Sequence, residues 1–81
     1  MKLNLLHYKE HLSVFIDLVP TTTDYETAAH YFNLCRQHGI QGSNTDFLIC
    51  ALAVNHRLTI FTTDNDFTHY KQYLPINLHT I

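Results

Sequence analysis

Three aspartates and a threonine, placed near the ends of an apolar run and a β-prone run, are the residues best suited to metal-dependent chemistry. Asp64 and Asp66 follow directly after the β-prone run that ends at Thr62 and Thr63, and Asp46 opens the apolar run that leads into the same strand. Clustered carboxylates bind hard cations such as Mg²⁺, which takes one or two of them and adds water and phosphate oxygens. A cation held in this way polarises a phosphodiester and activates water for attack.

The elements predicted around these aspartates bring them to one edge of the molecule. Residues 58–63 predict an interior strand with apolar side chains on both faces, and residues 46–54 predict a helix with no polar face. Ligands collect beyond the carboxyl ends of strands in an open parallel sheet, where Asp64 is expected to lie. A helix antiparallel to that strand places its amino end, and Asp46, at the same edge.

A purely structural role also explains these aspartates. Asp46 is three residues after Ser43, a position at which a carboxylate stabilises the positive end of a helix dipole by about 0.3–1 kcal/mol. Asp64 is a suitable N-cap, and residues 63–66 have the spacing of a capping box. Spacing alone favours this structural role over a metal site.

The first half of the chain predicts two helices. Apolar residues at mixed helical spacings over 3–15 predict a modestly amphipathic helix, followed by an extended connection that ends at Pro20. The run TDYE at residues 23–26 predicts a capping box formed by Thr23 and Glu26, which starts a helix over 24–38. A glycine supplies the left-handed stop at position 39.

The second half predicts an α/β unit. A short helix over 66–73 and a last strand over 76–80 follow the strand at 58–63, and the two strands are expected to be parallel with a right-handed crossover. A parallel sheet of two strands is too small to bury the apolar helix over 46–54. We therefore expect more chain or a second copy to complete the core.

Two motifs in the second half resemble those of PIN-domain ribonucleases, especially VapC-type toxins. The run DFLICALA at residues 46–53 and the run TTDNDF at residues 62–67 are similar to the family pattern D-x-L-I-A-A-x-A … T-x-D-x-D-F. Gly39 and Ile40 before the first motif, and the β-prone run between the motifs, fit the same pattern. The resemblance extends from Asp24 to the end of the chain.

The resemblance implies a partial PIN-like α/β fold and a metal-dependent endoribonuclease site. In the family, the aspartates that match Asp46 and Asp64 help to hold Mg²⁺ or Mn²⁺, and the residue that matches Asp66 is often close to the metals. The residue that matches Thr62 lines the site. These four residues are therefore the expected catalytic residues, with the three aspartates as metal ligands, RNA as the substrate and an antitoxin-like protein as a partner.

The opening of the chain departs from the family pattern. Family members begin with a strand that ends in an aspartate, and a glutamate follows on a helix, whereas the early acids here are Glu10, Asp17, Asp24 and Glu26. Glu26 is assigned to its cap and Glu10 to a solvated helix face. We expect residues 1–81 to form a single truncated PIN-like domain that lacks the amino-terminal strand and helices and holds its metal weakly.

Two functions are compatible with such a domain. The first is an endoribonuclease half-site that becomes active when another chain, or a longer form of the protein, supplies the missing part. The second is a degenerate PIN remnant that cleaves nothing and acts as a protein-interaction module, for example by capturing an amphipathic helix. We expect a dimer or higher oligomer, because the apolar helix over 46–54 cannot stay exposed in a monomer.

Composition limits the partners and the compartment. The chain is 46% apolar and 12% aromatic, which is typical of a globular protein, and its net charge of −2 predicts only weak binding of RNA by this chain alone. No apolar stretch reaches the roughly 18 residues needed to cross a bilayer. No signal peptide precedes Cys35 and Cys50, so we expect a cytoplasmic protein with two reduced, buried thiols.

Two further patterns have ordinary explanations. His7 and His11 have the four-residue spacing of some zinc sites, but no third ligand is nearby and surface histidines are the simpler interpretation. Tyr70 and Tyr73, with their polar neighbours, have the composition of a stacking platform for RNA bases, although packing against the sheet explains them better. Phe67 is expected to anchor the Asp64 loop to the core.

Overall fold

The computed structural model describes the backbone of residues 3–8 and 12–80 and the side chains of residues 19–79. Along these ranges the elements are β1 (Leu3–Tyr8), β2 (Leu12–Leu18), α1 (Thr22–Gln37), α2 (Asn44–Asn55), β3 (Thr59–Thr62), α3 (Asn65–Lys71) and β4 (Asn77–Thr80). The strands form one sheet in the order β1-β2-β3-β4, in which β3 and β4 are parallel and the other neighbours are antiparallel. The α/β class and the parallel pair predicted from the sequence are confirmed.

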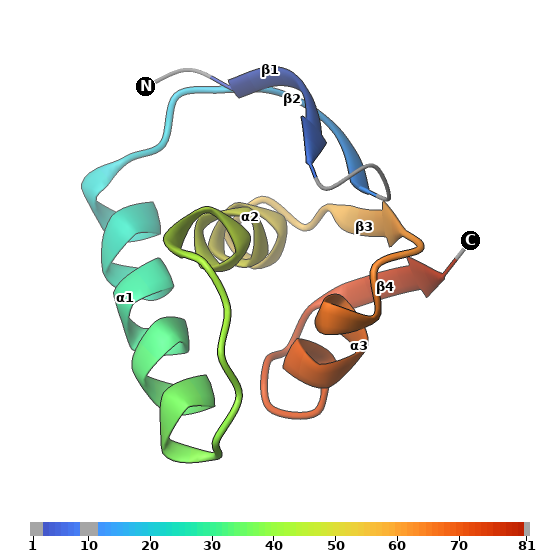
Figure 1. Cartoon of the computed structure of the whole chain (residues 1–81). Coiled ribbons are helices and arrows are strands. Elements are labelled where there is room, and N and C mark those ends of the chain that lie inside the picture. Colours follow the sequence, from blue (N-terminus) through green and yellow to red (C-terminus); the bar gives the residue numbers. More distant parts are fainter. Residues whose placement is uncertain (1–2, 9–11, 81) are drawn as a thin grey trace.

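Helix α2 is the centre of the molecule. It lies between α1 and the strands in Figure 1, and all of its residues from Asp46 to Ala53 are buried. The prediction that this helix is covered nearly all round is confirmed, but the cover comes from the same chain. The reason given above for an oligomer is therefore wrong, because the apolar helix is not exposed in a single copy.

The opening residues form a β-hairpin, and the predicted helix over 3–15 is wrong. In the pairing of β1 with β2, Leu5 lies opposite Phe15 and Leu6 lies opposite Val14. Val, Ile and Phe residues favour strands, and cross-strand pairing overrides the weak helix preference of an apolar pattern with mixed spacing. His7 lies in β1, so it has no helical spacing to His11, which is outside the described residues.

Helix α1 begins two residues earlier than predicted and has a different cap. Thr21 is the N-cap: its hydroxyl accepts a hydrogen bond from the Asp24 N–H at 3.3 Å, and Asp24 Oδ2 accepts one from the Thr21 N–H at 2.8 Å. The predicted box of Thr23 and Glu26 is wrong, and Glu26 is exposed. The predicted stop is confirmed, since Gly39 adopts a φ of 76° directly after the helix.

Strand β3 is interior to the sheet, as predicted. The prediction that apolar side chains on both of its faces are covered is wrong. Ile60 and Thr62 are buried on one side, whereas Phe61 on the other is 50% exposed. The described side chains therefore cover one face of this strand only. Among the described residues, 3–8 and 12–80, no helix is long and apolar enough to cross a membrane.

Candidate active site

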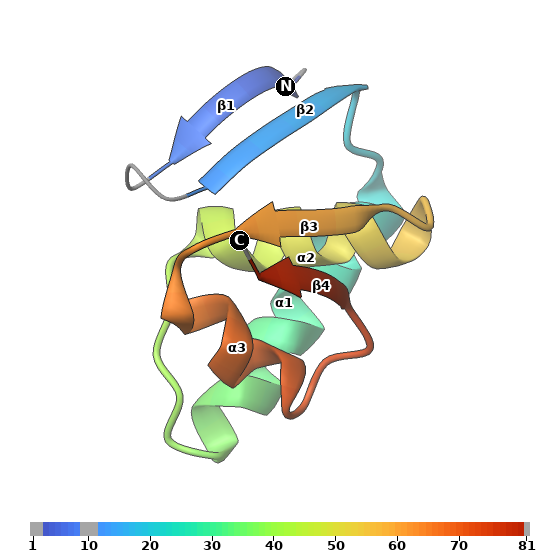
Figure 2. The ribbon, with the colours of Figure 1, turned by 90° about the vertical axis from the view of Figure 1, so that its right-hand side faces the viewer.

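The carboxyl end of β3 and the first turns of α2 and α3 meet at one edge of the molecule. Figure 2 shows the start of α2 and the tip of β3 on the same side, with α3 beginning beside them. Asp46 lies in the first turn of α2, and Asp64 and Asp66 begin α3. Because helix amino ends carry unpaired N–H groups and partial positive charge, both helices favour negative charge at this edge. The antiparallel placement of α2 and β3 expected from the sequence is therefore present.

Asp46 is fully buried and is oriented by a tyrosine. Its N–H donates to Ser43 Oγ at 3.1 Å, which confirms the position in the first turn that the structural interpretation assigned to it. Its Oδ2 accepts a hydrogen bond of 2.7 Å from the hydroxyl of Tyr70, and both side chains are 0% exposed. A charge-assisted bond of this length fixes the direction in which the carboxylate points.

The phenol of Tyr70 remains a donor at neutral pH. Burial raises its pKa above the usual 10.0, and the hydrogen bond to Asp46 and the negative charges of Asp46 and Asp66 raise the pKa further. Asp46 also helps burial to raise the pKa of the Cys50 thiol, one turn further along α2. Asp46 and Asp66 therefore both act on the same phenol.

Asp64 joins the end of β3 to the start of α3. Its Oδ1 accepts a hydrogen bond from the Asp66 N–H at 2.9 Å, and its own N–H donates to Thr62 Oγ1 at 2.8 Å. Thr62 is buried, whereas Asp64 and Asp66 are half-buried. Asp64 is therefore the N-cap that the structural interpretation predicted, and the same bonds hold its carboxylate at the edge of the sheet. Asp64 is therefore a helix cap and, at the same time, a candidate metal ligand.

Two residues of this edge were not recognised as part of it from the sequence. Tyr70 was assigned to packing, which its burial confirms, but its hydroxyl also reaches Asp46. A Cβ on Gly42 would overlap the Tyr70 hydroxyl and would lie 2.8 Å from Tyr70 Cζ and 3.0 Å from Phe47 Cε2, so only glycine leaves room for the tyrosine. The sequence carried one signal for the position of Tyr70. It is four residues after Asp66, and residues four apart share a helix face.

The carboxylates meet the modest requirement of magnesium. Among the residues that the structure describes, no three His, Cys, Asp or Glu side chains are close enough together to hold one ion. Mg²⁺ usually takes only one or two protein carboxylates and keeps several waters. Asp64 and Asp66, which are joined by the bond from the Asp66 N–H to Asp64 Oδ1, are the neighbouring carboxylates that could hold such an ion, with Asp46 at the same edge.

The early acids with a described position lie away from this edge. Asp17 is near the end of β2, but β2 is antiparallel to β3 and it is Leu12, at its start, that pairs with Thr62. Glu26 is exposed on the first turns of α1, where Asp24 and Thr27 contact Asn55 at the opposite end of α2. Glu10 lies outside the described residues.

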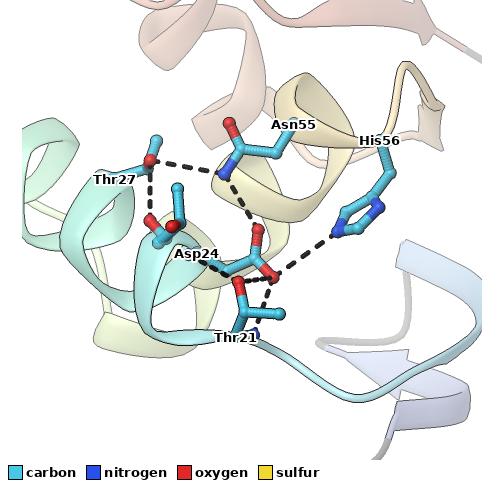
Figure 3. Close-up of polar contacts among 6 residues, drawn as sticks. Thr21, Asp24, Thr27, Asn55 and His56 are labelled. Atoms are coloured by element: carbon cyan, nitrogen blue, oxygen red, sulfur yellow. Dashed lines mark hydrogen bonds and ion pairs between the residues drawn. The ribbon is translucent and has the colours of Figure 1, made fainter.

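Asp24 belongs to a separate polar cluster. Figure 3 shows its carboxylate between Thr21 and the last residues of α2, where Asn55 Nδ2 donates to Oδ1 at 2.8 Å and His56 Nε2 is 3.4 Å from Oδ2. Burial opposes ionisation of Asp24, but the hydrogen bonds from Thr21, Asn55 and His56 outweigh it and lower the pKa. Asn55 is nine residues, or about 14 Å of helix, from Asp46, so this cluster cannot serve the same site.

Of the remaining predictions about single side chains, those on the cysteines and Phe67 agree with the structure. Cys35 and Cys50 are free and buried, and burial raises the pKa of both thiols, so neither is activated as a nucleophile. Phe67 is buried and packs edge-on against Tyr70. Tyr73 differs from the expected packing against the sheet, since it is half-exposed and stacks on His38 with ring centroids 4.0 Å apart.

Comparison with known proteins identifies one family. The family model of the PIN domain matches residues 3–73 of the chain. This match begins well before Asp24, where the resemblance noted in the sequence began, and so includes the residues of the opening hairpin. No curated protein and no solved structure matches the chain.

Proposed function

Because the chain belongs to the PIN-domain family, whose domain is generally a metal-using nuclease, we propose that it contributes the acidic site of a Mg²⁺- or Mn²⁺-dependent endoribonuclease of VapC type. One observation carries the proposal. Asp46, Asp64 and Asp66 occupy the motif positions of the family and lie at the same edge, formed by the end of β3 and two helix starts. We place this activity in the cytoplasm, as the composition suggested.

The residues of the site have separate roles in this proposal. Asp64 and Asp66 are half-buried and can reach a cation at the edge, whereas Asp46 is held from within by Tyr70. The bound cation would polarise the phosphodiester and activate water. Thr62 is buried and bonds to the Asp64 N–H, so it positions Asp64 and does not touch RNA.

The proposal includes a contribution from a second polypeptide. Among the early acids with a described position, Asp17, Asp24 and Glu26 lie away from the site, so we propose that a second chain supplies the further carboxylates of the family pattern. A second copy of this chain in an oligomer would provide them, and an antitoxin-like protein is a further expected partner. Exposed apolar side chains such as Val19 and Phe61 support such contacts.

Cleavage of a fluorogenic RNA tests the proposal. Wild type, Asp64→Asn and Glu26→Gln are compared in Mg²⁺ or Mn²⁺ and in EDTA. Asparagine caps a helix as well as aspartate does, so Asp64→Asn removes the charge and keeps the start of α3. Glu26→Gln is the matched control, because Glu26 is exposed and far from the site.

We expect metal-dependent cleavage that falls to the EDTA background in Asp64→Asn and is unchanged in Glu26→Gln. Trace contaminating nucleases would cleave equally in all three preparations. Equal rates in all three proteins would overturn the proposal. They would favour the alternative, a non-catalytic PIN module that binds a protein.

A further inference from the structure

A hollow of about 250 Å³ lies beside the candidate active site, between the loop after α1 and helix α3. Its lining comes from Gly39, Ile40 and Gln41 of the loop and from Asp66, His69 and Tyr70 of α3. Asp66 and Tyr70 also belong to the acidic edge described above. The hollow therefore borders that edge.

The loop side of the hollow has a fixed conformation. The Gly39 N–H donates to the Arg36 carbonyl at 3.0 Å, and the Ile40 N–H donates to the Cys35 carbonyl at 2.9 Å. On the other side of Gln41, Gly42 is packed closely against Tyr70. Gln41 thus stands between anchored neighbours, and a group that is positioned before binding loses less entropy when a ligand arrives.

The size and charge of the hollow favour a nucleobase over a phosphate. Pockets for drug-sized ligands measure about 300–1,000 Å³, so this smaller hollow suits a single ring system. Its described lining contains the carboxylate of Asp66 and neither Lys nor Arg, so an anion would be repelled. A neutral, flat group with hydrogen-bonding edges fits these conditions.

Gln41 and His69 supply the groups that can read such a ring. Both side chains are exposed, one on each side of the hollow. The carboxamide of Gln41 offers donors and an acceptor together, the pattern that pairs with two neighbouring atoms of a base. An imidazole such as His69 can stack on a base or bond to its edge. The hydroxyl of Tyr70 is committed to Asp46, so the tyrosine forms the floor.

We infer that this hollow binds one unpaired base of a single-stranded RNA next to the phosphate that is cut, and that Gln41 and His69 determine which base is accepted. The identity of the ligand as RNA rests on the proposed function. An unpaired base is required because the Watson–Crick edges of bases in a duplex are already paired, and RNA-binding proteins read sequence mostly in single strands.

The test measures binding without cleavage. The wild-type chain is titrated against fluorescein-labelled hexamers of A, C and U in EDTA at low salt, and the dissociation constants are obtained from anisotropy. Gln41→Ala and His69→Ala are compared with Gln37→Ala and His30→Ala. These controls remove the same side chains from exposed positions on α1 that do not line the hollow.

We expect the wild type to prefer one base by about fivefold or more, the lower end of what a two-bond contact to a base provides. Gln41→Ala and His69→Ala are expected to reduce this preference at least by half, while both controls retain it. Unchanged preference in both variants, or no binding of any hexamer, would overturn the inference. Circular dichroism of each variant shows whether its fold is retained.

The two proposals fail in different ways. If Asp64→Asn cleaves RNA as fast as the wild type, the proposed active site is wrong, but a base preference that depends on Gln41 still supports the hollow. If cleavage requires Asp64 but the base preference is the same in Gln41→Ala and His69→Ala, the proposed nuclease activity is supported and the proposed base site is wrong.

Discussion

Replacement of Tyr70 by phenylalanine isolates the bond that holds the acidic site together. The change removes one hydroxyl and keeps the ring, which packs against Phe47 and Phe67 with centroid distances of 5.0 and 5.1 Å. The lost bond is 2.7 Å long, buried and directed at the carboxylate of Asp46. Hydrogen bonds to charged groups contribute about 1.5–3 kcal/mol, so Tyr70→Phe is expected to lower the free energy of unfolding by that amount.

Such a loss is large for a chain of 81 residues. At about 0.05–0.15 kcal/mol per residue the whole domain is stable by roughly 4–12 kcal/mol. Urea unfolding followed by circular dichroism gives the difference directly, and the melting temperature is expected to fall by at least about 6 °C. Tyr73→Phe is the matched control, since Tyr73 is 38% exposed and we expect its hydroxyl to contribute less than about 0.5 kcal/mol.

The pH dependence gives the same bond a second signature. The pKa of Tyr70 is raised in the folded state above its usual 10.0, so the protonated phenol is favoured by folding. Its contribution is complete below pH 10 and is lost as the pH rises above 10 toward the folded value. The difference in stability between wild type and Tyr70→Phe is therefore expected to shrink above pH 10. A cost equal to that of Tyr73→Phe, or a difference that stays constant to high pH, would refute this reasoning.

Two further substitutions and one labelling experiment test other parts of the structure. Gly42→Ala forces Tyr70 away from its position, and we expect a loss of about 1–3 kcal/mol in urea unfolding; a stability equal to that of wild type would contradict the close contact. The lowered pKa of Asp24 means that its contribution to stability is present above its usual 3.8 and is lost as the pH falls through the lower folded value, so wild type is expected to lose its advantage over Asp24→Asn in acid titrations below pH 3.8. Cys35 and Cys50 are expected to react with a thiol reagent only after unfolding, and rapid labelling of the native protein would show that they are less buried than described.

The elements that the sequence predicted well are those with strong local signals. Ser43 caps α2 and Asp64 caps α3, and both are polar residues directly before a helix. Eight consecutive apolar residues at 47–54, after a capping residue, predicted a helix that is covered nearly all round. The parallel pairing of β3 and β4 followed from the helix between them, and their ends were predicted to within about two residues.

The elements that were missed depend on contacts between distant residues. The opening hairpin is held by pairs such as Leu5 and Phe15, which a local period cannot reveal. Any of three consecutive threonines, at positions 21–23, could cap α1. Thr21 is the cap because Asp24, its capping partner, is buried and accepts a hydrogen bond from Asn55, 31 residues away. The bond between Tyr70 and Asp46 spans 24 residues, so the orientation of the acidic site could not be predicted either.

The buried helix explains why capping and chemistry use the same residues. The buried middle of helix α2 has only apolar side chains, so side-chain hydrogen bonds can orient this helix only at its two ends. One end is held by Asp24, which accepts from Asn55, and the other by Tyr70, which donates to Asp46. A carboxylate at a helix start is held in place by the helix and by its own partner, and a metal site needs ligands that are held in this way. The structural role of Asp46 therefore supports the chemical one, because the bonds that stabilise the fold also set the position of the acid.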